Sequence, residues 1–381
     1  MTFFGNRGNL PEVQCALCGQ NSRLISEVLK VCGDCFRNNI GSTQAFIRQA
    51  HVQSRHGFDL PAEPPCDEGG VECTLCANRC RMKESSLGYC GLRTNQAEKL
   101  IHLGGTHDKG KVSWYHDPLP TNCVASWVCP AGSNAGYPDF SYEKGPELGY
   151  FNLAVFYEAC TFDCLYCQNW QFRERRSSPR YRTAQELANS VDRRTACVCY
   201  FGGDPTPQLF HALQASKTAL NRNSDRILRI CWETNGSMNP GLLQKMLDLS
   251  LHSGGCIKFD LKAHNENLNK ALCGVSNKQT LKNFRWVAEQ MAQRPDPPLL
   301  IASTLLVPGY IDAREVRSIA QFIASCDPEI PYSLLAFYPH FYMPDLPTTS
   351  LKHAEECQQA AIDAGLKRVH IGNLHLLSND Y

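Results

Sequence analysis

The chain has 381 residues, 43% of them hydrophobic, and its 38 lysine and arginine residues nearly balance 37 acidic residues. A net charge of +1 provides no broad basic surface, so neither nucleic acid nor an anionic membrane is an expected partner. The opening MTFFGNRGNLPEVQC lacks the apolar core of a signal peptide, and no run of about 18 apolar residues occurs. We therefore expect a cytoplasmic protein with one large core and small additions.

The 21 cysteines are the unusual part of the composition. Disulfide-rich domains are short and exported, and this chain meets neither condition. Clustered cysteines in a reducing compartment more often bind metal, and three tight groups occur along the chain. Several other cysteines stand in apolar runs such as ACVCYF (196–201) and ILRICWET (227–234), where we expect small buried side chains.

The first cysteine group lies in a module that we expect over residues 1–60. Its C-x2-C-x13-C-x2-C spacing is typical of a zinc ribbon and predicts a structural zinc ion at Cys15, Cys18, Cys32 and Cys35. A rubredoxin-like iron and unliganded thiols are the alternatives. A helical stretch, STQAFIRQAHVQSRH (42–56), follows. The module's charge gives little basis for phosphate binding, so we expect it to serve in docking.

The second group lies in a region expected over residues 61–150, after the break DLPAEPPCDEGG (59–70). This region is rich in Cys, Gly and Pro and has weak periodicity, which predicts loops wrapped around metal. Its four cysteines indicate a metal site that suits a second iron–sulfur cluster or zinc equally well: Cys73, Cys76, Cys80 and Cys90.

From residue 151 short apolar runs alternate with amphipathic helical runs, beginning with FNLAVFYE (151–158) and reaching YSLLAFYP (332–339). Repeated βα units indicate parallel strands covered by helices. We therefore predict an α/β fold, a partial (β/α)6 TIM-like barrel over residues 151–350. Residues 351–381 add a helix and a strand, KRVHIGN (367–373), that complete the barrel.

The third group follows the first strand of the predicted barrel, in YEACTFDCLYCQNW (157–170). Its C-x3-C-x2-C spacing places Cys160, Cys164 and Cys167 at the C-terminal rim, where barrel enzymes build their sites. A catalytic zinc ion usually recruits His or carboxylate ligands. A [4Fe–4S] cluster held by three cysteines instead leaves one iron free for a small molecule.

This spacing, with Tyr166 before the third cysteine, resembles the signature of the radical S-adenosylmethionine (SAM) superfamily. The resemblance implies that SAM chelates the free iron through its amino and carboxylate groups. It also implies that one electron splits SAM into methionine and a 5′-deoxyadenosyl radical, while the protein positions that radical. A reduced flavodoxin or ferredoxin is the implied electron donor.

The ends of later strands carry further parts of the same pattern. FGGDPTP (201–207) resembles the family's glycine-glycine-acid segment. By that resemblance Gly202 and Gly203 let SAM approach the backbone, and Asp204 accepts its ammonium group. The family more often has Glu at this place, so the reach is one methylene shorter here.

ETNG (233–236) and KFDLK (258–262) resemble the branch around the pyruvate formate-lyase activating enzyme. The resemblance implies that Thr234 and Asn235 contact SAM and that the catalytic side chains facing the substrate are Asp260 and Lys262.

Together these expectations describe a radical SAM oxidoreductase that abstracts hydrogen from a substrate, with a protein favoured, as in glycyl-radical-enzyme activation. Radical modification of another peptide, an RNA or a small molecule is the first alternative. A non-catalytic iron–sulfur and zinc scaffold, or an electron carrier, is the second. The preference for a protein substrate rests on resemblance of the fold branch, which is weak evidence for a substrate.

Overall fold

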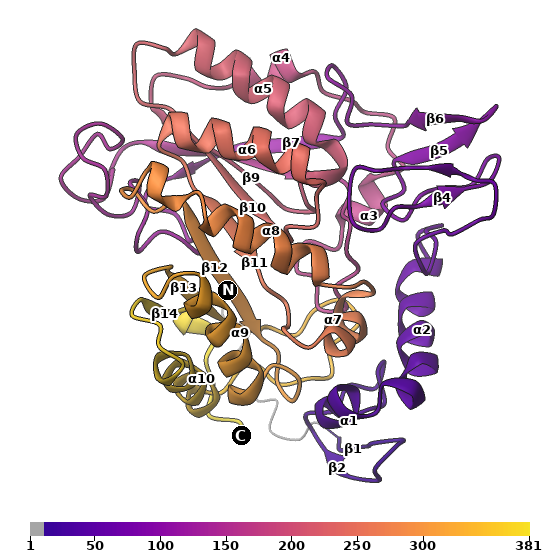
Figure 1. Cartoon of the computed structure of the whole chain (residues 1–381). Helices are drawn as coiled ribbons and strands as arrows, with labels where there is room; N and C mark the ends of the chain where they lie inside the picture. Colours follow the sequence, from indigo (N-terminus) through magenta and orange to yellow (C-terminus); the bar gives the residue numbers. More distant parts are fainter. Residues whose placement is uncertain (1–10) are drawn as a thin grey trace.

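The computed structural model describes residues 11–381, so the first ten residues of the module expected over residues 1–60 lie outside the described part. An eight-stranded sheet runs through the molecule in the order β14-β13-β12-β11-β10-β9-β8-β7 (Figure 1). Its seven mutually parallel strands are β8 (Phe151–Tyr157), β9 (Thr195–Phe201), β10 (Arg229–Thr234), β11 (Ile257–Asp260), β12 (Leu300–Leu306), β13 (Tyr332–Ala336) and β14 (Val369–Gly372). The two ends of this order do not pair within residues 11–381, so the predicted partial barrel is confirmed.

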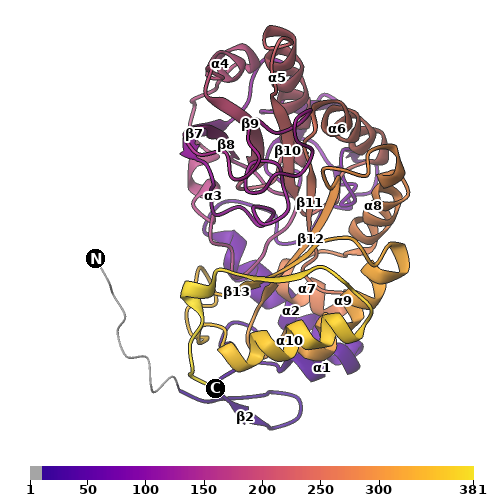
Figure 2. The ribbon, with the colours of Figure 1, turned by 90° about the vertical axis from the view of Figure 1, so that its left-hand side faces the viewer.

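The helices that connect the strands cover the outer face of the sheet. They are α3 (Phe172–Arg175), α4 (Ala184–Asn189), α5 (Leu209–Arg222), α6 (Pro240–Ser253), α7 (Glu266–Cys273), α8 (Lys278–Ala288), α9 (Ala313–Cys326) and α10 (Leu351–Asp363). Figure 2 shows α5, α6, α8 and α9 as an arc around the strands. In α9, Asp312 caps the first turn and a stripe of Val316, Ile319 and Ile323 is buried, as expected of an amphipathic helix on a sheet.

Strand β7 (Val112–Pro118) was not expected from the sequence. It pairs antiparallel with β8, from Val112 opposite Tyr157 to Pro118 opposite Phe151. The expectation of loops alone over residues 61–150 is therefore wrong for this stretch. Most side chains of β7 are partly or fully exposed, as on an edge strand, so the sequence lacks the apolar run that marks the buried strands.

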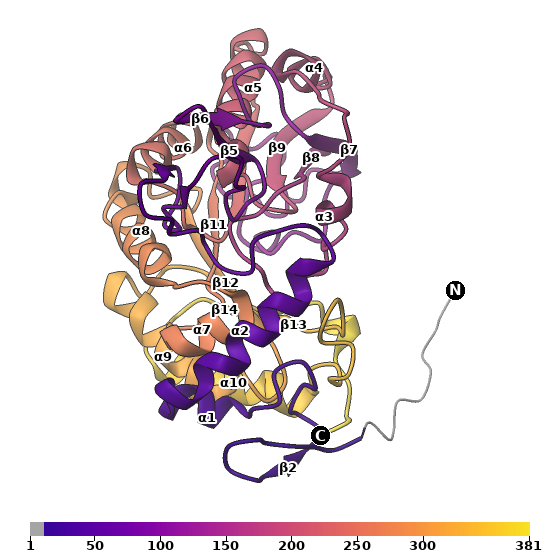
Figure 3. The same ribbon diagram turned by 90° about the vertical axis from the view of Figure 1, so that its right-hand side faces the viewer.

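The remaining strands of the N-terminal regions form three short antiparallel pairs. They are β1 (Val13–Gln14) with β2 (Asn21–Ser22), β3 (Val71–Glu72) with β4 (Arg81–Met82), and β5 (Arg93–Gln96) with β6 (Lys99–His102). Two helices, α1 (Gly33–Asn38) and α2 (Ile40–His56), pack against α7 at the rim of the barrel (Figure 3).

The first module is fastened to the barrel at the start of α9. Arg37 contacts Asp312 at 2.9 Å and Glu315 at 3.3 Å, and the Tyr310 hydroxyl accepts a hydrogen bond from Ser26 N at 3.0 Å. These groups are largely buried, so the module is part of one packed body with the barrel. Among residues 11–381, no helix combines the length and apolar character needed to cross a membrane.

Candidate active site and metal centres

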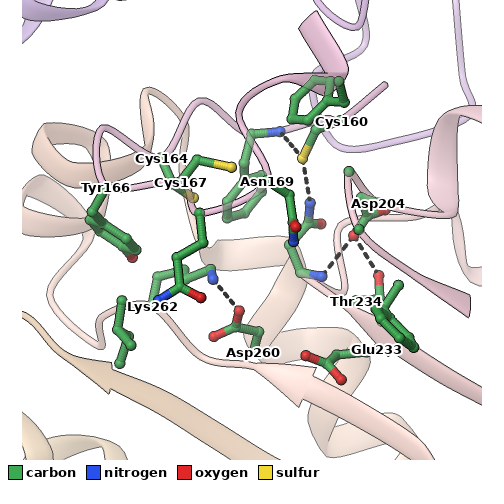
Figure 4. A pocket seen from close by; sticks show the side chains of 18 of the residues that line it. Cys160, Cys164, Tyr166, Cys167, Asn169, Asp204, Glu233, Thr234, Asp260 and Lys262 are labelled. Carbon is green, nitrogen blue, oxygen red and sulfur yellow. Dashed lines mark hydrogen bonds and ion pairs between the residues drawn. The ribbon is translucent and has the colours of Figure 1, made fainter. Parts of the chain in front are cut away.

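A cavity lined by cysteines, glycines and charged residues lies at the C-terminal ends of the parallel strands and has a volume of about 180 Å³. The loop after β8 brings three predicted metal ligands to its wall, Cys160, Cys164 and Cys167 (Figure 4). Within residues 11–381, only the possible ligand atoms of Cys15, Cys18, Cys32 and Cys35 all lie within 4.8 Å of one another. The three thiols of the cysteine loop therefore do not converge on the position of a single metal ion, but they line the same cavity.

A buried carboxylate inside the same loop fixes its path. Asp163 is fully buried, and its Oδ1 lies 2.8 Å from the Arg173 guanidinium and 3.6 Å from that of Arg55. Its Oδ2 lies 2.8 Å from His51 Nδ1 and accepts a hydrogen bond from Ser54. Burial alone would raise the pKa of Asp163, but these partners hold it well below the usual range. Because three of the partners belong to α2, the N-terminal module anchors the loop that carries the cysteines.

Helix α7 supports the loop from behind. Asp163 N and Leu165 N donate to the carbonyl groups of Cys273 and Leu272, at 2.9 and 3.0 Å. The Cys273 thiol lies 3.5 Å from Cys164 Sγ and 3.6 Å from the Tyr166 hydroxyl. Neither this thiol nor the Asp163 network was expected from the sequence, because each joins residues about a hundred positions apart.

Two glycines form the wall of the cavity next to the cysteine loop. Gly202 and Gly203 have φ angles of +68° and +63°, a region that favours glycine. A Cβ on Gly202 would lie 2.0 Å from a ring carbon of Phe156, and one on Gly203 would lie 2.1 Å from the Tyr157 carbonyl oxygen. No larger residue fits, so this backbone forms an open cradle beside the three thiols.

Asp204 follows the glycines and ties two strand ends together. Its Oδ1 accepts a hydrogen bond from Thr206 N, and its Oδ2 accepts bonds from Thr234 Oγ1 and Asn235 N, at 2.8–2.9 Å. Burial raises its pKa, although these hydrogen bonds act in the opposite direction. Its carboxylate thus already accepts three hydrogen bonds from the protein, and few of its lone pairs remain for a bound amino group.

Asn235 turns its side chain from the end of β10 toward the cysteine loop. Its Nδ2 donates to Thr161 Oγ1 at 2.8 Å and lies 3.7 Å from Cys160 Sγ. Thr234 and Asn235 both line the cavity, so the structure brings the two predicted SAM contacts next to the predicted cluster ligand.

Charged groups at the ends of β10 and β11 also line the cavity. Lys262 and Asp260 form an ion pair, and Lys262 Nζ lies 5.8 Å from the centre of the Tyr166 ring (Figure 4). Asp260 Oδ1 is buried and has no hydrogen-bond partner among the described residues. Burial raises the pKa of the neighbouring Glu233 to about 7, against the effect of Lys258. An unpartnered carboxylate oxygen and a half-ionised carboxyl are therefore available to a bound molecule.

This arrangement fits a three-thiolate iron–sulfur cluster and SAM. Three thiols supply soft ligands around a shared space, the glycine cradle admits a ligand close to the backbone, and Asp260 Oδ1 lacks a partner. The predicted site residues from all four strand ends therefore meet in one cavity.

The first cysteine group has a different geometry. Cys15 Sγ lies 3.9 Å from Cys35 Sγ, and Cys18 Sγ lies 3.8 Å from Cys32 Sγ. A tetrahedron of thiolates around one ion, with metal–sulfur bonds of about 2.3 Å, has edges of roughly 3.8 Å. Burial would raise the pKa of Cys15, yet hydrogen bonds from backbone N–H groups lower it to about 6. The four side chains could therefore hold a metal ion.

The second cysteine group lines a smaller cavity, shared by Cys73, Cys76, Cys80 and Cys90. Their sulfur atoms do not converge within 4.8 Å as those of the first group do. The segment also contacts the active-site loops: Ala77 N donates to Ser237 O at 2.9 Å, and Asn78 Nδ2 donates to Thr161 O at 2.8 Å. The two cavities thus lie on either side of the Cys160–Thr161 segment.

Comparison with known proteins agrees with this geometry. Residues 154–323 match the model of the radical SAM superfamily. An uncharacterized protein of Methanocaldococcus jannaschii is 25% identical over 316 residues, which cover 81% of this chain and 83% of the relative. The isethionate sulfite-lyase activating enzyme of Desulfovibrio desulfuricans is 30% identical over 126 residues, covering 30% of this chain and 39% of that enzyme.

Among solved structures, a domain of the pyruvate-formate lyase-activating enzyme from Bacteroides vulgatus is similar, with a TM-score of 0.36 and 22% identity. The match covers 46% of this chain and 98% of that domain. The family match spans the cysteine loop, the glycine cradle and the ends of β10 and β11. Residues 154–323 of the chain therefore form a radical SAM domain.

Proposed function

We propose that this enzyme abstracts a hydrogen atom from a polypeptide substrate that reaches the cavity from the rim of the barrel. Cys160, Cys164 and Cys167 would hold the [4Fe–4S] cluster, and SAM would lie between the cluster and the glycine cradle. When bound, the cluster and SAM supply a 5′-deoxyadenosyl radical as the hydrogen-abstracting agent. Similarity to two activating enzymes supports a protein substrate, and the similar stretches cover 39% and 64% of their lengths.

The observation that carries the proposal is the restricted space around the site. The cavity has a volume of about 180 Å³, so a bound SAM molecule would leave little of it for a second molecule. Residues 121–133 pack into the barrel from the opposite end, where Trp127 Nε1 donates to Ser333 Oγ at 2.9 Å. The substrate must therefore enter by the rim and place only a small group inside, as a polypeptide loop can.

The residues of the chain have distinct roles in this proposal. Gly202 and Gly203 admit SAM next to the backbone, and Thr234 and Asn235 orient its polar groups beside Cys160. Asp204 acts mainly by holding the ends of β9 and β10 together, and it can accept one further hydrogen bond from the SAM amino group. Asp260 and Lys262 face the substrate end, where Asp260 Oδ1 would accept a hydrogen bond from the bound molecule.

The other two cysteine groups would hold resident metals. The tetrahedral spacing of the Cys15 group supports a structural zinc ion. The wider spacing of the Cys73 group, around a cavity, favours an iron–sulfur cluster over zinc. Its position beside Thr161 would suit the transfer of electrons from a reduced flavodoxin or ferredoxin toward the active site.

The test of the radical reaction uses anaerobically reconstituted full-length protein with SAM and dithionite. We expect 5′-deoxyadenosine from the wild type and none from the triple variant Cys160→Ala, Cys164→Ala and Cys167→Ala. The single variant Cys326→Ala, on the outer helix α9, is the matched control and should match the wild type. Intact cluster and SAM binding without any turnover, with or without added extract, would favour the scaffold reading instead.

The test of the substrate class adds a cell extract from the source organism. Extract protein should raise 5′-deoxyadenosine formation, and prior digestion of the extract with a protease should remove that stimulation. If the stimulating component passes an ultrafiltration membrane and survives the protease, the substrate is a small molecule and the polypeptide proposal is wrong. Removal by ribonuclease alone would point to RNA.

A further inference from the structure

A second group of thiols lies inside the barrel, apart from the three groups that the sequence singled out. The expectation that cysteines in the apolar strands are small buried side chains accounts for their burial but not for their positions. Six cysteines line one small internal cavity: Cys123, Cys129, Cys197, Cys199, Cys231 and Cys256.

Strand register explains why three of them meet. Cys199 of β9 pairs with Cys231 of β10, and Trp232 pairs with Ile257 of β11. Cys256, one residue before Ile257, therefore continues the same row across the sheet. Neighbouring residues in one row of a parallel sheet point to the same face, and here that is the inner face of the barrel.

The segment that closes the barrel supplies two more thiols from the opposite direction. Ala125 and Val128 of this segment pack against Cys256 and Ile301. The Ser333 hydroxyl donates to Val124 O at 2.7 Å, which fixes the segment over the sheet. Cys123 and Cys129 are thereby held opposite the row of strand cysteines, and both line the cavity between the two.

A buried cation lies in the middle of these thiols. Lys258 is 1% exposed, and its Nζ lies 2.8 Å from Cys199 Sγ and 3.1 Å from Cys123 Sγ. Its nearest carboxylate oxygen, Glu233 Oε2, is 3.6 Å away. A buried ammonium group is costly without close anionic partners. Its position between two sulfur atoms is therefore best explained if these sulfurs carry negative charge.

The cavity and the buried cation lie together among the six thiols. Cysteines that serve only as small apolar side chains need neither a cavity nor a cation.

We propose that the interior of the barrel holds a further iron–sulfur cluster, with thiolate ligands from Cys123, Cys129, Cys199 and Cys231. Three of these thiols are only partly buried and line the cavity: Cys123, Cys129 and Cys231. Cys199 is buried and contacts Lys258. Cys256 donates to Cys231, and Cys197 donates to Asn152 Oδ1 at 3.5 Å, so both are supporting thiols. Lys258 partly neutralises the negative charge of the ligand set.

The spacing favours a cluster over a single ion. Among residues 11–381 only the Cys15 group has its ligand atoms within 4.8 Å of one another, so the interior thiols, like those of the Cys160 group, do not converge on one point as the ligands of a single ion would. The site also adjoins the active site, since Lys258 contacts both Cys199 and Glu233 and Glu233 lines the SAM cavity. A cluster here would face the reacting groups from the closed end of the barrel.

The test compares two double variants of the full-length protein, reconstituted anaerobically with ferrous iron and sulfide. Cys123→Ala/Cys129→Ala removes two proposed ligands, and Cys66→Ala/Cys326→Ala is the matched control outside all four groups. We expect the first variant to lose about two or about four iron atoms per chain, with equal sulfide, as for one [2Fe–2S] or [4Fe–4S] cluster. The control should lose none, and Mössbauer spectra should show one component missing.

Three outcomes would overturn the proposal: equal iron in both variants, loss of zinc without loss of iron, or a disulfide among these cysteines in anaerobic wild-type protein. None of these readouts depends on the substrate or on turnover. If Cys123→Ala/Cys129→Ala does not fold, the proposal is tested with Lys258→Met, and Lys258→Arg is the conservative control. Loss of the positive charge should lower the reduction potential of one cluster in Lys258→Met and not in Lys258→Arg. Unchanged reduction potentials in Lys258→Met would contradict the proposal.

Discussion

The thiols of the Cys15 group lie at the edges of a tetrahedron, with sulfur–sulfur distances of 3.8 and 3.9 Å. Those of the Cys160 group surround a cavity of about 180 Å³ and do not converge. The first geometry closes four ligands on one point. The second leaves space for a cluster and for a molecule bound to it. The same side chain thus builds a closed structural site in one region and an open reactive site in the other.

The two regions are also connected. Helix α2 begins directly after the Cys15 group and supplies His51, Ser54 and Arg55 to Asp163, which lies between the first two cysteines of the open group. A metal that orders the N-terminal module therefore also positions the cluster loop. Four changes, ordered by expected effect, would break or sharpen this comparison.

The largest effect is expected from Cys164→Ala in the open group. With two thiolates left, the loop cannot hold a [4Fe–4S] cluster, so formation of 5′-deoxyadenosine should fall to the level without enzyme. The melting temperature of the metal-free protein should change little, because Cys164 contacts a cavity on one side. Chromatographic assay of 5′-deoxyadenosine and iron analysis check both parts. Full activity in this variant would remove the open group from the mechanism.

The same substitution in the closed group, Cys32→Ala, should have the opposite profile. A structural site contributes to folding directly, and its loss unfolds small metal-bound modules. We expect loss of one metal ion and faster hydrogen exchange over the N-terminal module, with most of the active-site iron retained. Turnover should fall several-fold because α2 loses support. A loss of iron equal to that in Cys164→Ala would show that the two regions are not separable.

Much of this comparison could be predicted from the sequence. The spacing of the cysteines identified both groups, and the apolar runs identified all seven parallel strands. Both features depend only on residues that are close together in the sequence. The Asp163 network, Cys273 and the interior thiols could not be predicted in the same way. Each depends on residues brought together by strand register or by helix packing, such as Cys199 with Cys231, and their local sequence resembles ordinary apolar strand.

The link between the two regions is tested by Asp163→Asn. Removing the charge leaves Arg173, Arg55 and His51 around a neutral group, and breaking a buried ion pair in this way costs about 3–5 kcal/mol. We expect a loss of stability of that order and lower retention of cluster iron, both measured by denaturant unfolding and iron analysis. Asp248→Asn, on the exposed side of α6, is the control and should stay within about 0.5 kcal/mol.

The pH dependence of Asp163 has a defined sign. Its pKa in the folded protein lies well below the value of about 3.9 in an unfolded chain. The stabilisation is therefore fully present above about pH 5 and is lost only as the pH falls through the folded pKa. The difference in unfolding free energy between wild type and Asp163→Asn should stay constant from about pH 5 to about pH 8. A difference that vanishes near neutral pH would show that Asp163 is not ionised in the folded loop.

The smallest effect is expected from Glu233→Gln, which tests whether the charge of Glu233 contributes to SAM affinity. Burial raises the pKa of Glu233 to about 7, so its side chain gains a negative charge as the pH rises through that value. SAM carries a positive charge at its sulfonium group, so wild-type affinity for SAM should increase over the same range, while that of the variant should stay flat. For a partly exposed charge pair worth about 1 kcal/mol, the difference at about pH 8 is roughly fivefold. Equilibrium dialysis of reconstituted protein measures it, with Glu158→Gln, a half-buried carboxyl outside the cavity, as the matched control. An equal rise in both variants would assign the pH dependence to another group and leave Glu233 as a partner of Lys258 alone.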